Sequence, residues 1–275
     1  MECIVFTKFL VPLTLEEMAE RVKELGFDGA DLPVRPGSQV THENAAKLLP
    51  EAVRLFKDQG LSVPTIVTSL KSATDEHAEE VIATAADQGV RMLRTGSWSF
   101  RPGDNFKDIL TQCRRDLESL ESLCEKYGVK ANFQIHSGSC LNCNVGISLM
   151  MLKGRNPEWI GIQIDPGHLE VSGEIQPLAF AMTGEFLHNV NVKSPRYYAM
   201  PGSHPGQLDW RILWQPLPEG LVNWRNVFSI LKDIGYTGPL SIHGEYPVEK
   251  DPDMSSQLIA KDLQFVKGLL NELDM

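Results

Sequence analysis

The chain has 275 residues, 42% of them hydrophobic, and its 36 acidic residues outnumber its 26 basic ones to give a formal net charge of −10 at pH 7. This composition is typical of a globular protein and excludes a disordered chain, and the acidic excess disfavours a nucleic-acid partner, because phosphate binding requires a basic surface. Residues 1–13 lack the basic leader of a signal peptide, and no apolar run reaches the roughly 18 residues of a membrane span, so we expect no membrane partner.

The sequence predicts an alternation of strands and helices. A strand over residues 3–6 precedes a helix over residues 15–25, and Thr14 and Glu17 form a capping-box pattern at the start of that helix. Apolar residues at three- and four-residue steps predict the later helices, and short apolar runs predict the later strands. The remaining expected elements are helices over 44–59, 75–88, 106–127, 224–234 and 255–273, strands over 160–165 and 187–193, and a long Pro- and Gly-rich loop over 194–222.

One short pattern recurs between these elements. A helical segment ends on a glycine, which is followed by an apolar residue and a short strand; the glycines are Gly26, Gly60, Gly89, Gly128 and Gly235. The first four are 29 to 39 residues apart, and the last interval, of 107 residues, has room for about three units. Eight strand–helix units therefore fit the chain, and we predict an α/β fold, a closed (β/α)₈ barrel with a single domain over 1–275. A doubly wound open sheet is the second choice.

The polar residues at the ends of the expected strands are the candidates for a functional site, because barrels of this kind carry their sites at the carboxyl ends of the strands. Gln134 and His136 flank Ile135 and can reach one cavity, and His243 and Glu245 alternate in the same way. A satisfied core pair is the alternative for each. The other candidates are Asp31, Arg35, Thr68, Arg94, Asp165, His168, Asn191 and Lys193, with Trp98 and Arg196 in the loops that follow two of the strands.

Several of these motifs resemble those of the xylose isomerase-like TIM barrels, the sugar phosphate isomerase/epimerase group of the AP endonuclease family 2 superfamily. The resemblance covers nearly the whole chain, which looks like a divergent member. It rests on Leu-Glu-Glu at 15–17, Gly-Phe-Asp-Gly-Ala-Asp-Leu at 26–32, Ile-Asp-Pro-Gly-His at 164–168, Val-Lys at 192–193, Pro-Glu-Gly-Leu-Val-Asn-Trp at 218–224 and Gly-Tyr-Thr-Gly-Pro-Leu-Ser-Ile at 235–242.

The resemblance implies a site for one divalent metal, which family members bind through two Glu, one Asp and one His. Asp165 matches the family Asp, and His168 matches a histidine that contacts substrate. Gln134 stands where a Glu is expected, and Asn191 stands where the His is expected. His243 takes the place of the last Glu, and Glu245 follows two residues later.

These departures leave two alternatives for a cofactor. Asp165, His136, His168 and Glu245 would form a rearranged site for Mn, Zn, Mg or Fe. Otherwise Lys193 takes the place of the metal as a fixed positive charge.

The resemblance implies an isomerase or lyase acting on a small sugar or polyol derivative. A two-base epimerase is disfavoured, because Gln134 cannot transfer a proton. A single-base isomerase or a dehydratase would use Glu245 or His243 as the base and Lys193 to stabilise an enediolate. The expected substrate contacts are Gln134, His168, Asn191, Arg94, Trp98 and Arg196.

Two other functions compete with this one. A barrel that binds a sugar-like ligand without turnover fits the loss of the expected Glu and His, whereas an abasic-site nuclease is disfavoured by the thin ligand set and the acidic balance. The odd number of cysteines, five, fits a reducing cytoplasm, where we expect the protein, and a homo-oligomer stays open.

Overall fold

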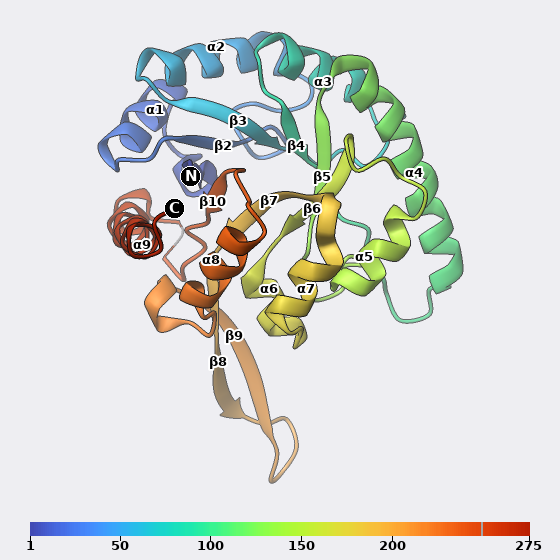
Figure 1. The fold of residues 1–275 in the computed structure, drawn as a ribbon, viewed down its shortest axis with the longest axis vertical. Helices are drawn as coiled ribbons and strands as arrows, with labels where there is room; N and C mark the ends of the chain where they lie inside the picture. The colour runs from blue at the N-terminus through green and yellow to red at the C-terminus, as the bar shows by residue number, and fades with distance from the viewer. Residues whose placement is uncertain (249) are drawn as a thin grey trace.

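The computed structural model describes residues 1–248 and 250–275 and shows a closed barrel of parallel strands surrounded by helices (Figure 1). Around the barrel the strands follow the order β1-β10-β7-β6-β5-β4-β3-β2. The predicted (β/α)₈ barrel is confirmed. Its strands are β1 (Cys3–Phe6), β2 (Gly29–Pro33), β3 (Ser62–Val67), β4 (Met92–Arg94), β5 (Lys130–Gln134), β6 (Ile160–Ile164), β7 (Leu187–Val192) and β10 (Leu240–Ile242).

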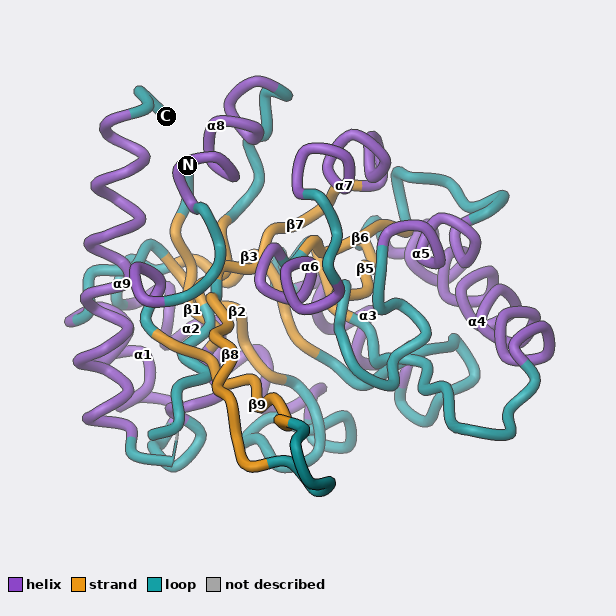
Figure 2. Tube along the Cα trace, turned by 90° about the horizontal axis from the view of Figure 1, so that it is seen from below, coloured by secondary structure: helices purple, strands orange, loops and turns teal. Residues whose placement is uncertain are grey.

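The helices pack on the outside of the barrel (Figures 1 and 2). They are α1 (Leu15–Glu24), α2 (Ala45–Asp58), α3 (Ala78–Asp87), α4 (Phe106–Tyr127), α5 (Val145–Leu152), α6 (Pro166–Ser172), α7 (Gln176–Thr183), α8 (Trp224–Asp233) and α9 (Pro252–Glu272). Every helix predicted from the sequence is present, with ends within three residues of the predicted ones, whereas α5, α6 and α7 have no counterpart among the predicted elements. None of the helices in the described part of the chain combines the length and the apolar character that crossing a bilayer requires.

Local interactions fix the ends of the helices where the sequence pattern placed them. At the start of α1, the Glu17 backbone N–H donates to Thr14 Oγ1 at 3.2 Å, and the Thr14 backbone N–H donates to Glu17 Oε2 at 2.8 Å. At the end of α4, Gly128 adopts a φ of +65°, a conformation that costs glycine little because it has no Cβ. The chain therefore turns from α4 directly into β5.

The segment predicted as a long loop is instead largely an antiparallel ribbon. It comprises β8 (Ser194–Pro201) and β9 (Leu208–Gln215), which project away from the barrel (Figures 1 and 2). Pro195 and Pro201 favoured the loop prediction, but a two-stranded ribbon tolerates proline because each strand has a free edge. The ribbon begins at the residue after Lys193 and carries Trp214 back to the mouth of the barrel.

We predict that Gly161→Ala destabilises the barrel. A Cβ at Gly161 would lie 2.5 Å from the His188 ring, and that ring is anchored because its Nε2 lies 2.7 Å from the Pro157 carbonyl oxygen. Overpacking of this kind lowers the free energy of unfolding by about 1–3 kcal/mol, which chemical denaturation measures.

Gly268→Ala is the matched control, because a Cβ at this position in α9 meets open space. It should raise the free energy of unfolding by about 0.5–1 kcal/mol, the usual gain when alanine replaces glycine within a helix. Equal stability of the Gly161→Ala variant and the wild type would contradict the close packing of β6 against His188.

Candidate active site

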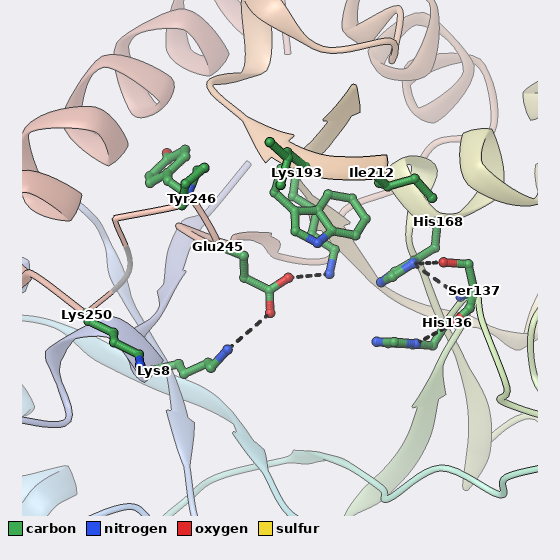
Figure 3. Close-up of a pocket in the computed structure, with 12 residues that line it drawn as sticks. Lys8, His136, Ser137, His168, Lys193, Ile212, Glu245, Tyr246 and Lys250 are labelled. Carbon is green, nitrogen blue, oxygen red and sulfur yellow. Dashed lines mark hydrogen bonds and ion pairs between the residues drawn. The ribbon is translucent and has the colours of Figure 1, made fainter. Parts of the chain in front are cut away.

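Two cavities with shared walls open at the carboxyl ends of the barrel strands. The first has a volume of about 580 Å³ and is shown in Figure 3, and the second has a volume of about 380 Å³. Both are lined by Lys8, His136, Lys193 and Glu245. Three of these residues follow strands β5, β7 and β10, and Lys8 follows β1. The candidate site is therefore where the barrel architecture predicts it.

Lys193 is the central cation of the first cavity. Its Nζ lies 2.6 Å from Glu245 Oε2 and 3.5 Å from Asp165 Oδ2. The same ammonium lies 4.4 Å from the centre of the Trp214 ring, a cation–π contact. The lysine is only 3% exposed, so these partners offset the cost of removing its charge from water.

Glu245 is held in its ionised form. Burial raises the pKa of this carboxyl, but the charge of Lys193, followed by His243, the Lys193 hydrogen bond and Lys8, outweighs burial and lowers the pKa well below its usual value. Its other oxygen lies 3.9 Å from Lys8 Nζ. A carboxylate with so low a pKa is a weak base, so this geometry favours Glu245 as a partner that fixes Lys193.

Asp165 is surrounded by hydrogen-bond donors. It caps the N-terminus of α6, where Oδ1 accepts the His168 backbone N–H at 3.0 Å. Its Oδ2 accepts the Gln134 side-chain amide at 2.6 Å and the Asn191 amide at 3.3 Å. Gln134 Oε1 in turn accepts a hydrogen bond of 2.7 Å from Arg94. The two residues that stand in place of the expected Glu and His therefore serve as amide donors to Asp165.

These donors do not fit a divalent metal. Within residues 1–248 and 250–275, no three His, Cys, Asp or Glu side chains converge on a point where they could hold one. The predicted ligands are Asp165, His136, His168 and Glu245. Lys193 lies between the two carboxylates, and its positive charge would repel a cation there. The structure thus favours the alternative in which an ammonium takes the position of the metal.

Ser137 fixes the protonation of two neighbouring histidines in opposite senses. The Ser137 carbonyl oxygen lies 2.9 Å from His136 Nδ1, whereas its backbone N–H and its hydroxyl lie 3.2 and 2.8 Å from His168 Nδ1. A carbonyl can only accept and an N–H can only donate, so the proton of His136 is on Nδ1 and that of His168 is on Nε2. The two rings are in contact, with centroids 4.1 Å apart and planes tilted by 36°.

His136 consequently presents an unprotonated nitrogen to the cavity. Burial, and after it the charge of Lys193, lowers the pKa of both His136 and His168, so both rings are neutral at pH 7. In Figure 3 the second nitrogen of His136 points into the space bordered by Glu245 and Lys8. A neutral imidazole in this tautomer can accept a proton from a bound ligand.

His243 lies below the cavities and lines neither of them. Its ring packs 4.7 Å from the Phe6 ring, and its Nε2 lies 3.9 Å from Asp31 Oδ2. The side chain is fully buried, and burial followed by the Lys193 charge holds its pKa well below the usual value. In this arrangement His243 therefore does not reach a ligand in either cavity, as the predicted role of a base would require.

Two predicted substrate contacts lie elsewhere. Trp98 is buried in the core, where its indole N–H donates to Asp116 at 2.8 Å and its ring packs edge-on against Phe133. Arg196 is exposed on β8, with its guanidinium 5.4 Å from the Tyr198 ring. The positions of these two side chains depend on packing that the local sequence does not reveal. The remaining predicted contacts either line a cavity, as Gln134, Arg94 and His168 do, or support Asp165 from behind, as Asn191 does.

Several cavity residues were not among the candidates from the sequence, and Lys8, Ser137 and Trp214 are the ones that contact the charged or imidazole groups of the site. Lys8 and Ser137 lie within three residues of the ends of β1 and β5, so the rule that selects strand ends applies to both. Trp214 belongs to the ribbon that was expected to be a loop, and its ring packs 4.8 Å from the His168 ring. Only the ribbon register places Trp214 over the barrel mouth.

Comparisons with known proteins agree with this architecture. The chain matches the family model described as xylose isomerase-like TIM barrel over residues 19–269, and no curated protein matches it. Similar solved structures include 3-keto-D-glucoside 4-epimerase from E. coli, with a TM-score of 0.73 and 15% identity over 98% of this chain and 99% of that one. L-ribulose 3-epimerase has a TM-score of 0.71 and 17% identity, over 100% of this chain and 97% of that one. The probable 3-DHS dehydratase from Bacillus anthracis has a TM-score of 0.71 and 16% identity, over 94% and 98%. At these identities the structural likeness shows a shared fold.

We predict that Lys193→Met strongly destabilises the protein, because it leaves the Glu245 carboxylate without its closest partner. The loss in the free energy of unfolding should be on the order of 3 kcal/mol, the usual result of removing one member of a buried ion pair. Denaturant titration at pH 7 measures it. The double variant Lys193→Met/Glu245→Gln should regain part of the loss, since it removes the unpaired charge as well. If the double variant is less stable than Lys193→Met by the full cost of Glu245→Gln alone, the two side chains are not coupled.

Proposed function

Because the chain belongs to the xylose isomerase-like TIM barrel family, we propose that it is a sugar isomerase or dehydratase that removes a proton from the carbon next to a carbonyl group. Its substrate is a small sugar or polyol derivative. One observation carries the proposal: the buried Lys193 ammonium and the unprotonated nitrogen of His136 face the same cavity. The epimerases and the dehydratase with similar folds lend it support as chemical precedents.

Lys193 supplies the electrophile. Its ammonium donates a hydrogen bond to the substrate carbonyl oxygen and stabilises the negative charge that develops there as the enediolate forms. Because Asp165 and Glu245 already hold the ammonium in place, little reorganisation is needed during the reaction. Preorganised charges of this kind contribute several kcal/mol to transition-state stabilisation.

His136 is the base in this proposal, in place of the predicted Glu245 or His243. Its Nε2 takes the proton from the carbon next to the carbonyl, and Ser137 holds the other ring nitrogen in the protonated form. Return of the proton to the former carbonyl carbon, together with passage of the hydroxyl proton from one oxygen of the enediolate to the other, completes an isomerisation. Transfer of the proton to a departing hydroxyl group completes a dehydration and releases water. No step requires a metal, because the donors around Asp165 do not fit one.

A binding protein without turnover is the second candidate. It is favoured by the internal pairing of the two carboxylates, since Asp165 and Glu245 are both engaged by other side chains before any ligand arrives. In such a protein, His136 would contact the ligand and move no proton.

Solvent exchange distinguishes the two candidates. We expect the protein to incorporate deuterium from D₂O at the carbon next to the carbonyl of its substrate, which proton NMR detects across a panel of aldoses, ketoses and keto sugars. His136→Asn should slow this exchange by roughly 10²–10⁴-fold, the usual contribution of a placed general base. Treatment with a chelator should leave the wild-type rate unchanged.

The matched control is His204→Asn, which makes the same change at an exposed position in the ribbon turn and should leave the rate unchanged. Sugars that raise the melting temperature without any exchange would identify the protein as a binder. Exchange that persists at the full rate in His136→Asn would exclude His136 as the base.

A further inference from the structure

We propose that the second cavity contains an oxyanion subsite, in which Arg35 and Arg94 bind a carboxylate or phosphate group of the ligand. The inference deepens the proposed function, on which it rests for the idea that the ligand is a substrate. It makes that substrate a sugar acid or a sugar phosphate instead of a neutral sugar.

The two guanidinium groups share one aromatic ring. The guanidinium carbon of Arg94 lies 5.0 Å from the centre of the Phe6 ring, and that of Arg35 lies 5.5 Å from the same centre. Arg94 is the last residue of β4 and is 8% exposed, and both arginines line the second cavity. These cation–π contacts with Phe6 restrain both guanidinium groups, whose planar forks suit the geometry of a carboxylate or phosphate.

Among the described residues, neither arginine has a carboxylate partner of its own. In the part of the chain that the structure describes, no carboxylate oxygen forms an ion pair with Arg35 or Arg94. The Arg94 side chain donates a hydrogen bond to the neutral amide oxygen of Gln134. Asp31 lies deeper in the barrel, where it interacts with the arginines only at distances longer than an ion pair. It accepts a hydrogen bond of 2.8 Å from the Ser241 hydroxyl, and burial raises its pKa to about 6. A buried guanidinium without a close counter-ion is costly, and an anionic ligand would remove that cost.

The balance of charges in the cavity points the same way. Four cationic side chains line it, and the only carboxylate among its described lining residues is Glu245, which is already bound to Lys193. The cationic residues are Lys8, Arg35, Arg94 and Lys193. The protein as a whole is strongly acidic, so this local excess of positive charge is opposite to that of the surface at large.

The subsite is also placed to orient a substrate for the proposed reaction. Lys193 and His136 line the same cavity as the two arginines, and a volume of about 380 Å³ holds a short sugar chain. Gln134 connects the arginines with the lysine, because it accepts a hydrogen bond from Arg94 and donates one to Asp165, which lies beside Lys193. An oxyanion fixed by Arg35 and Arg94 would leave the rest of the molecule facing the ammonium and the imidazole.

Calorimetric titration tests the subsite without turnover. The probes are D-ribose, D-ribonate and D-ribose 5-phosphate, which share a carbon skeleton and differ in charge. We expect at least one anionic probe to bind about tenfold or more tightly than D-ribose, because hydrogen bonds to charged groups contribute more than neutral ones. Preference for D-ribonate identifies a sugar-acid site, and preference for D-ribose 5-phosphate identifies a sugar-phosphate site. Equal affinity for all three probes, or no anion binding at millimolar concentration, overturns the proposal.

Substitutions of the two arginines test whether they form the binding site of the anion. Arg35→Met and Arg94→Met should each weaken the preferred anion by about tenfold or more and leave the affinity for D-ribose unchanged. Arg91→Met is the matched control: it makes the same change at the exposed residue just before β4, and it should have no effect. If Arg94→Met does not fold, Arg35→Met, at a partly exposed position, decides the question. Unchanged anion affinity in a folded Arg35→Met variant overturns the proposal.

The two proposals fail separately. Anion binding that depends on Arg35, without any deuterium exchange, would retain the subsite and remove the enzymatic function. Exchange with neutral sugars, together with no preference for anions, would retain the enzymatic function and remove the subsite.

Discussion

The contact of Lys193 with Asp165 and Glu245 is the interaction on which the rest of the site depends. It joins the ends of three neighbouring strands, β6, β7 and β10, around a single buried charge. Because the ammonium is fixed there, Glu245 stays ionised, a divalent cation has no place between the carboxylates, and the imidazole of His136 is the neutral group opposite. The properties of the neighbouring side chains therefore follow from one positive charge in a nearly closed space.

The sequence predicted the barrel well because its signals are local and repeated. Helix periodicity, the capping box of α1 and glycines such as Gly128 each act within a few residues, and the closure of eight parallel strands follows from their number. The rule that sites lie at the carboxyl ends of barrel strands also predicts that Asp165, Lys193 and Glu245 lie close together, as they do. What it could not predict depends on side-chain packing: His243 and Glu245 alternate on one strand end, but only the packing against Phe6 shows that His243 is enclosed. Likewise, Trp98 and the ribbon depend on long-range contacts that no local pattern encodes.

Gln134 and Asn191 illustrate how two small changes alter the chemistry of a site. Each has the size of a plausible metal ligand, but each brings an amide that donates to Asp165. The carboxylate is then satisfied by protons instead of by a cation. Gln134 also accepts from Arg94, so one amide aligns an aspartate and an arginine at once. The charges within the site are thus arranged differently from those of the metal site that the family resemblance implies.

The ribbon of β8 and β9 has a mechanical consequence for this arrangement. Lys193 is followed directly by Ser194, the first residue of β8, and Trp214 of β9 lies against the same ammonium from above. The ribbon therefore adjoins the lysine at its backbone and contacts it at its ammonium group, and the far end of the ribbon extends well beyond the barrel (Figure 1). Trp214 can leave the ammonium only if β9 moves, and β9 is paired along its length with β8, so the aromatic cover of the charge is coupled to the backbone next to the lysine.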